Sequence, residues 1–234
     1  MNRALMLALA TVLPASAAAA APVAMTAMHT ESATAKPIRL PRLAKFPDAG
    51  IMAKVNAALA AQESDDIHGR ADCLAQVKEA GEKPENDTYA VSVDVTYLSA
   101  RYLSVRDHTN YFCAGAHPDF TDTVLTFDLA TGAPINVMDA LKPDFVSGGM
   151  GKLYAARYRL PKKKDDDACR GWAGDPNNLS DPYARLDAKA GVVIGFQPAH
   201  VVAACADDLP LSVADLDKVM KDRTLLADLK ATVK

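Results

Sequence analysis

The stretch Tyr111-Phe112-Cys113-Ala114-Gly115-Ala116-His117-Pro118, followed by Val124-Leu125-Thr126-Phe127-Asp128-Leu129-Ala130-Thr131-Gly132, decides the fold. Aromatic and β-branched residues in both parts predict two strands. The first strand stops at a turn that carries Gly115, Ala116 and His117, and the second is closed by the turn from Asp128 to Gly132. Strands joined by so short a connection pair antiparallel, so we expect an antiparallel sheet with His117 at one corner.

Further strands are predicted on both sides of this stretch. Large apolar residues occupy every second position of 89–95, which is the period of a strand with one buried face. A strand over 98–105 follows, and the polar residues 107–110 predict a turn after it. The apolar run 190–196 has the length of one more strand.

Helical spacing of apolar residues predicts helices before and after these strands. Residues 51–60, with Asp48 as the N-terminal cap, predict one helix, and 67–77 predict a second helix after a polar interruption. Later helices are predicted over 145–160, 212–220 and 224–229. The sequence therefore predicts an α+β fold, an antiparallel β-sheet with helices packed on one face.

The N-terminal segment has the composition of a secretory signal peptide, with a positive start, an apolar stretch and then small residues. We therefore expect residues 1–21 to be removed, 22–40 to form a flexible linker, and 41–234 to form a single domain that is periplasmic or secreted. Retention of the segment as a membrane anchor is the alternative. No second stretch is apolar over the length of a membrane span, so none is expected in the mature chain.

The four cysteines, Cys73, Cys113, Cys169 and Cys205, lie far apart in the sequence. An oxidising compartment favours two disulfides, and the absence of a C-x-x-C pair argues against a redox motif or a zinc knuckle. Three pairings are possible. We favour Cys73 with Cys113 and Cys169 with Cys205, because each pair joins a helix or loop to an adjacent strand end.

Composition and motifs narrow the range of functions. The formal net charge is −3 with acidic and basic residues interspersed, so a nucleic-acid partner is not expected. The sequence has no H-E-x-x-H, G-x-S-x-G or P-loop pattern. The run Asp165-Asp166-Asp167 lacks the alternation and the glycine of a calcium loop, and we interpret it as part of an exposed loop over 161–182. Neither a cofactor nor a metal is therefore expected.

Three elements in this order resemble the RsiV-like extracytoplasmic domain family, typified by the ectodomain of a lysozyme-sensing anti-sigma factor. They are an aromatic-led strand with its histidine turn, an aspartate-containing strand with its Thr-Gly turn, and a short segment soon after. In this sequence they are Tyr111 with Gly115-Ala116-His117, Phe127-Asp128 with Thr131-Gly132, and Val137 to Leu141; Phe196-Gln197-Pro198 matches a later element. Ala114 stands where the family usually has a glycine, and Ala199-His200 where it has a tyrosine.

The resemblance implies a non-enzymatic binding domain that recognises a cell-envelope component or a lysozyme-like protein, with loops 107–122 and 161–182 as contact surface. The alternative is a cell-wall-directed hydrolase or metal-dependent enzyme that uses His117, for which Asp119, Asp122 and His108 are candidate partners. We favour a turn histidine that bonds a backbone carbonyl, because the motif lacks the context of a catalytic site. Asp128 is expected to cap its own turn.

Overall fold

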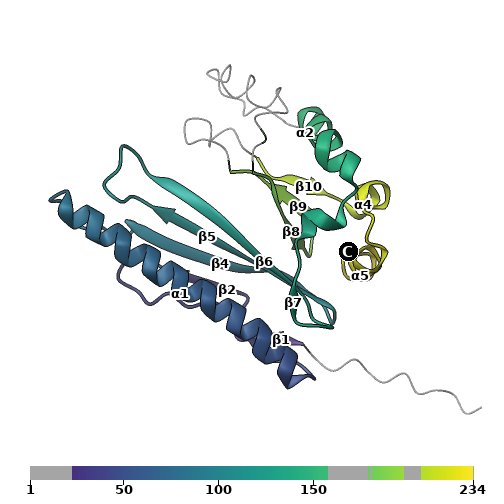
Figure 1. Ribbon diagram of the computed structural model, residues 1–234, viewed down its shortest axis with the longest axis horizontal. Coiled ribbons are helices and arrows are strands. Elements are labelled where there is room, and N and C mark those ends of the chain that lie inside the picture. Colours follow the sequence, from purple (N-terminus) through teal and green to yellow (C-terminus); the bar gives the residue numbers. More distant parts are fainter. Residues whose placement is uncertain (1–22, 158–178, 180, 198–206, 234) are drawn as a thin grey trace, which may run out of the picture.

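The computed structural model describes residues 23–157, 179, 181–197 and 207–233. It has an α+β fold with antiparallel sheets, as the sequence predicts. A long helix covers one face of a five-stranded sheet, and a three-stranded sheet with the remaining helices lies on the opposite face (Figure 1). The predicted signal peptide lies outside the described residues.

The five-stranded sheet has the order β2-β4-β5-β6-β7, and every neighbouring pair is antiparallel. Its strands are β2 (His29–Ser32), β4 (Tyr89–Leu98), β5 (Tyr102–Tyr111), β6 (Asp119–Asp128) and β7 (Ala133–Pro134). The predicted turn at 107–110 is wrong, because these residues continue β5. Asp107 and Thr109 are buried on the helix side of the sheet, and the polar sequence concealed this alternation.

Helix α1 (Ala49–Glu79) is one continuous helix of 31 residues, so the prediction of two helices is wrong. The Asp48 side chain accepts hydrogen bonds from the Gly50 and Ile51 backbone N–H groups, which is the predicted cap. The polar middle of the helix stays helical because Gln62 and Asp66 find buried partners there. The apolar residues buried on this helix are Val55, Leu59, Cys73 and Val77.

The predicted linker over 22–40 is wrong for its described part. Strand β1 (Ala24–Met25) pairs with β3 (Leu43–Lys45), and β2 adds an edge strand to the five-stranded sheet by pairing with β4. Ile38 and Leu40 are buried in the core beneath α1. The low periodicity that predicted a linker reflects strands of only two to four residues.

The three-stranded sheet has the order β10-β9-β8, with β8 (Tyr183–Asp187), β9 (Gly191–Gly195) and β10 (Leu209–Leu211). Its apolar face packs against the other helices in a second core. These helices are the 3₁₀ turn Val137–Ala140, the π turn Phe145–Gly149 with α2 (Met150–Arg157), α4 (Val213–Val219) and α5 (Arg223–Thr232). The predicted strand at 190–196 and the predicted helices at 212–220 and 224–229 are confirmed, as is the described part of the helix at 145–160.

Strand β4 contributes side chains to both cores because it has a β-bulge between Val95 and Tyr97. Up to Val95, the large residues of β4 face α1, whereas Tyr97 faces the second core. The extra residue reverses which side of the strand faces which core. The Tyr97 hydroxyl donates a 2.7 Å hydrogen bond to the Asp228 carboxylate on α5, which ties the last helix to the large sheet.

Of the two favoured disulfides, Cys73–Cys113 is present and joins α1 to the chain just after β5. Cys169, Cys205 and the Asp165–Asp167 run lie outside the described residues. Within the described ranges, no helix combines the length and the apolar character that crossing a membrane requires.

Candidate functional site

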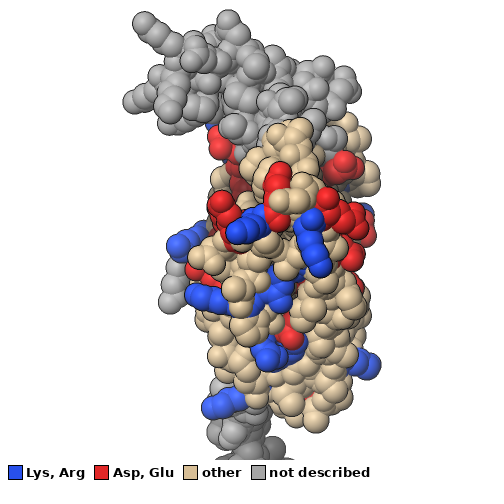
Figure 2. Space-filling model, turned by 90° about the vertical axis from the view of Figure 1, so that its left-hand side faces the viewer, with Lys and Arg blue, Asp and Glu red and all other residues tan. Residues whose placement is uncertain are grey.

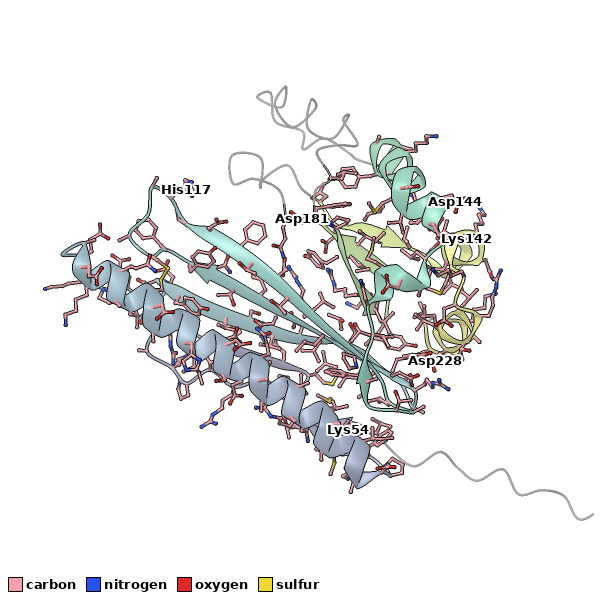
Figure 3. All side chains as sticks on the ribbon, viewed as in Figure 1. Lys54, His117, Lys142, Asp144, Asp181 and Asp228 are labelled. Carbon is pink, nitrogen blue, oxygen red and sulfur yellow. A yellow bond between two sulfur atoms is a disulfide. The ribbon has the colours of Figure 1, made fainter. Side chains whose placement is uncertain are left out.

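The turn between β5 and β6 lies at the free end of the large sheet and carries His117 at its exposed tip (Figure 3). The His117 ring Nδ1 lies 3.2 Å from the Pro118 carbonyl oxygen, a contact of the kind that we expected for a turn histidine. Of its three candidate partners, Asp119 starts β6, while His108 and Asp122 lie within the strands and contact each other. The structure therefore pairs His108 with Asp122 within the sheet, three register positions before the end of the hairpin that carries His117.

Ala114 adopts a backbone φ of +60° at the start of this turn. This is the left-handed region, in which a Cβ atom clashes with the backbone and glycine is favoured. The position is the one at which the resembling family usually has a glycine, so the departure introduces local backbone strain into the turn.

The Cys73–Cys113 disulfide fixes this turn to α1. Between the turn, the α1–β4 connection and the start of β6 lies a hollow of ≈480 Å³. Its apolar walls include Val77, Tyr111 and Phe112. The charged residues that line it are Glu82, Lys83, Glu85, Asp87 and Asp119.

Four of these five charged groups are acidic, so the hollow carries a local negative charge. Figure 2 views this end of the molecule and shows acidic and basic residues interspersed over it. The negative excess therefore belongs to the hollow and not to the whole face. We call this hollow with its turn 112–118 the tip site.

A second polar cluster surrounds Asp122 on the sheet face opposite α1. Arg106 donates from Nε to Asp122 Oδ1 at 2.6 Å and from Nη2 to Oδ2 at 3.1 Å. His108 Nδ1 lies 3.0 Å from Oδ1, and the Tyr183 hydroxyl of β8 donates to Oδ2 at 2.8 Å. Gly195 lies directly opposite Tyr183 and leaves room for its ring, because a Cβ atom there would lie 2.2 Å from it.

The Asp122 cluster is an ion pair in a buried setting, since the Asp122 side chain is only 3% exposed. Burial alone would raise the pKa of Asp122. The hydrogen bonds from His108 and Arg106 and the positive charge of Arg106 outweigh burial and hold the pKa well below its usual range. Asp122 therefore stays ionised and fixes β8 on the large sheet.

A third cluster, the Asp66–Asp107 pair, lies on the other face of the same strands, beneath α1. Asp66 of α1 and Asp107 of β5 are 5% and 1% exposed. The Gln62 amide Nε2 donates to Asp66 Oδ1 at 2.9 Å and to Asp107 Oδ2 at 3.0 Å. Burial and then the Asp107 charge raise the pKa of Asp66, and burial also raises the pKa of Asp107.

The remaining motif residues hold a turn. The Asp128 Oδ1 accepts a hydrogen bond from the Ala130 backbone N–H at 2.8 Å, which is the expected cap. Both Asp128 oxygens also pair with Arg101 at 3.0 Å. Gly132 has a φ of +71°, which favours glycine, and a Cβ atom there would lie 3.4 Å from Ile51 and Lys54 of α1.

In the part of the chain that the structure describes, no three His, Cys, Asp or Glu side chains gather as a metal site would require. The sequence indicated Asp122 and His108 only as partners of His117, and it did not indicate the Asp66–Asp107 pair. The alternation of Val105, Asp107, Thr109 and Tyr111 could have indicated the buried Asp107. It continues the period of the strand if polar residues are allowed at buried positions.

Comparison with known proteins gives a fold and no activity. No protein-family model and no curated protein matches the chain. A solved structure of a DUF3298 family member from Bacteroides fragilis has a TM-score of 0.58 and 14% identity, covering 91% of this chain and 99% of that one. A DUF3298 family protein from Pseudomonas aeruginosa has a TM-score of 0.52 and 12% identity, with 88% and 96% covered. The chain is thus similar in fold to proteins of this uncharacterised family.

Proposed function

We propose that this chain is a non-enzymatic binding domain, exported to the periplasm or secreted, whose tip site contacts a cell-envelope component or a lysozyme-like protein. The observation that carries the proposal is the hollow of ≈480 Å³ at the free end of the sheet, built from three chain segments. A disulfide and a paired β-hairpin hold these segments, so the surface is presented by a rigid scaffold.

The charge of the tip site suggests the chemistry of the partner. Four acidic side chains around an apolar floor suit a protein surface that offers Lys or Arg beside an apolar group. A lysozyme-like protein, implied by the resemblance of the sequence, is the first partner to test. The exposed His117 lies at the edge of the same surface and could donate or accept a hydrogen bond there.

Binding can be tested with the immobilised mature chain and soluble lysozyme. We expect Glu82→Gln/Glu85→Gln to weaken binding about tenfold at low salt, on the order of the loss of two rim ion pairs, and added salt to weaken wild-type binding. The matched control Asp144→Asn/Asp217→Asn removes two exposed charges far from the tip and is expected to bind as the wild type does. Equal loss in both variants, or no retention of lysozyme at micromolar concentration, would rule out this partner at this site.

The non-enzymatic reading has its own test. We expect neither the wild type nor His117→Ala to hydrolyse cell wall, and we expect the variant to differ from the wild type only in partner binding. Cell-wall hydrolysis by the wild type that His117→Ala abolishes at unchanged Tm would contradict it. Mass spectrometry of the unreduced protein from envelope fractions would test export, cleavage near residue 21 and the second disulfide together.

A further inference from the structure

Two acidic side chains meet at the centre of the α1–sheet contact, where neither has a cationic partner. Asp66 Oδ1 and Asp107 Oδ2 lie 2.9 and 3.0 Å from the same neutral donor, the Gln62 amide Nε2, which brings the two carboxyl groups together. The outer oxygens, Asp66 Oδ2 and Asp107 Oδ1, are buried without a hydrogen-bond partner. Two carboxylates this close and this dry cannot both stay ionised at low cost, so a proton shared between them is the stable arrangement.

The surroundings reinforce this state. The titratable groups that act on the pair, or on Tyr89 beside it, are Asp65 of α1, Tyr89 of β4, Tyr111 and His108 of β5, and Asp122 of β6. The negative charges of Asp65 and Asp122 oppose a second negative charge on the pair. His108 lies on the opposite face of β5 and is already paired with Asp122. Arg70, one helical turn after Asp66, points its guanidinium to the Lys36 carbonyl instead.

We propose that Asp66 and Asp107 form a proton-operated clasp, in which one shared proton holds the middle of α1 on β5 and its loss loosens this contact. Without the proton, the two like charges face each other in a buried site with only the Gln62 amide between them. The helix must then move away from the strand or admit water.

The clasp borders a groove from which water could enter once the shared proton is lost. A hollow of ≈320 Å³ lies between α1 and the sheet, with Asp66, Gln62 and Thr109 among its lining residues. The Cys73–Cys113 disulfide closes one end of this hollow, and Tyr111 lines both this hollow and the tip site. Loss of the proton would therefore widen the groove beside Asp66, while the Cys73–Cys113 disulfide keeps the other end of α1 attached to the turn.

The sign of the pH effect follows from the raised pKa of Asp66. Between the ordinary pKa of an unfolded aspartate, about 4, and the raised value in the folded chain, the folded state holds one proton more than the unfolded state. The stability that the clasp provides is complete below about pH 4 and is lost as the pH rises through the folded pKa.

Urea unfolding between pH 5 and pH 9 tests the clasp. In the wild type, the unfolding equilibrium constant is expected to rise by up to about tenfold per pH unit until the shared proton is lost. Asp66→Asn mimics the protonated acid and is expected to flatten this slope. Asp72→Asn, which removes an exposed charge on the same helix outside the groove, should keep the slope of the wild type.

Hydrogen exchange and NMR make the test independent of variant folding and of partner binding. After correction for the intrinsic pH dependence of exchange, the backbone amides of α1 around Asp66 are expected to exchange faster at pH 9 than at pH 5 in the wild type. No such increase is expected in Asp66→Asn. In carboxyl-labelled wild type, one of the two aspartates should titrate above pH 6. An unchanged slope in Asp66→Asn, or titration of both carboxyl groups below pH 5, would overturn the proposal.

Discussion

The two faces of the large sheet treat a buried aspartate in opposite ways. Asp107 of β5 lies one register position from Asp122 of β6, and both are nearly inaccessible to solvent. On the face towards β8, Asp122 receives hydrogen bonds from Arg106 and Tyr183 and lies beside His108, and its pKa is held low. On the face towards α1, Asp107 meets another carboxyl group and an amide, and its pKa is raised.

The difference shows that burial alone does not decide whether a carboxyl group is ionised. Both aspartates lose their hydration, but only Asp122 gains a cationic partner, Arg106, in return. Because side chains alternate along a strand, consecutive residues such as Arg106 and Asp107 contribute to different faces. A single strand thereby builds an ion pair on one side and a protonated pair on the other.

The largest expected effect comes from removing the covalent bond on the α1 face. The double variant Cys73→Ser/Cys113→Ser opens a loop of sequence separation 40, and its free energy of unfolding is expected to fall by about 4 kcal/mol. Urea unfolding under non-reducing conditions measures this loss. A loss below about 1 kcal/mol would show that noncovalent contacts hold α1 and the turn together without the disulfide.

Breaking the ion pair on the β8 face is expected to cost about 3 kcal/mol. Asp122→Asn removes the charge that Arg106 faces while keeping the shape, and Arg106, a quarter exposed, recovers part of its hydration. Because the pKa of Asp122 is depressed in the folded state, its contribution is present above about pH 4 and is lost as the pH falls further. The variant should therefore lose stability at pH 7 and converge with the wild type in acid; Asp119→Asn serves as the control on the same strand.

A smaller change tests the same face without touching its charges. Tyr183→Phe removes only the hydroxyl that donates to Asp122 at 2.8 Å, and we expect a loss of about 1.5 kcal/mol. Thermal unfolding at pH 7 is the measurement. If Tyr183→Phe were as costly as Asp122→Asn, β8 would depend on this single hydrogen bond and not on the ion pair.

The smallest effect is a gain, in the turn that joins the strands carrying both aspartates. Ala114 has a φ of +60°, and Ala114→Gly is expected to raise the free energy of unfolding by about 1 kcal/mol by removing the left-handed strain. Ala116→Gly, two residues later and without a positive φ, is the control and should be neutral or slightly destabilising. Destabilisation by Ala114→Gly would mean that the turn does not adopt this conformation in solution.

The elements that the sequence predicted correctly have a strong apolar signal. Strand β4 and helix α5 show regular apolar spacing, α5 also has an aspartate cap, and β9 is a continuous apolar run of strand length. Cys73 and Cys113 paired as predicted: Cys113 lies just after the end of β5, and Cys73 lies on the buried face of α1. Short strands such as β1, β2 and β10 have too few residues to show a period.

The candidate sites were harder to predict for a physical reason. Asp107 and Asp122 each occupy a buried position that the usual pattern reserves for an apolar residue, and around Asp107 the polar residues predict a turn instead of a strand. Their partners, Asp66 and Tyr183, are 41 and 61 residues away in sequence, and only the tertiary fold brings them close. His117 stood out in the sequence because its turn is local, and the structure places it at the surface.

The continuous helix α1 has a mechanical consequence. At 1.5 Å per residue, its 31 residues span about 46 Å, and its backbone hydrogen bonds continue without a break. One end region is bonded through Cys73 to the turn at the tip, and the other begins beside the short β1–β3 ribbon that leads to the N-terminal segment. A displacement of the turn would therefore act on α1 as one rigid rod and would be felt at its far end, beside the β1–β3 ribbon.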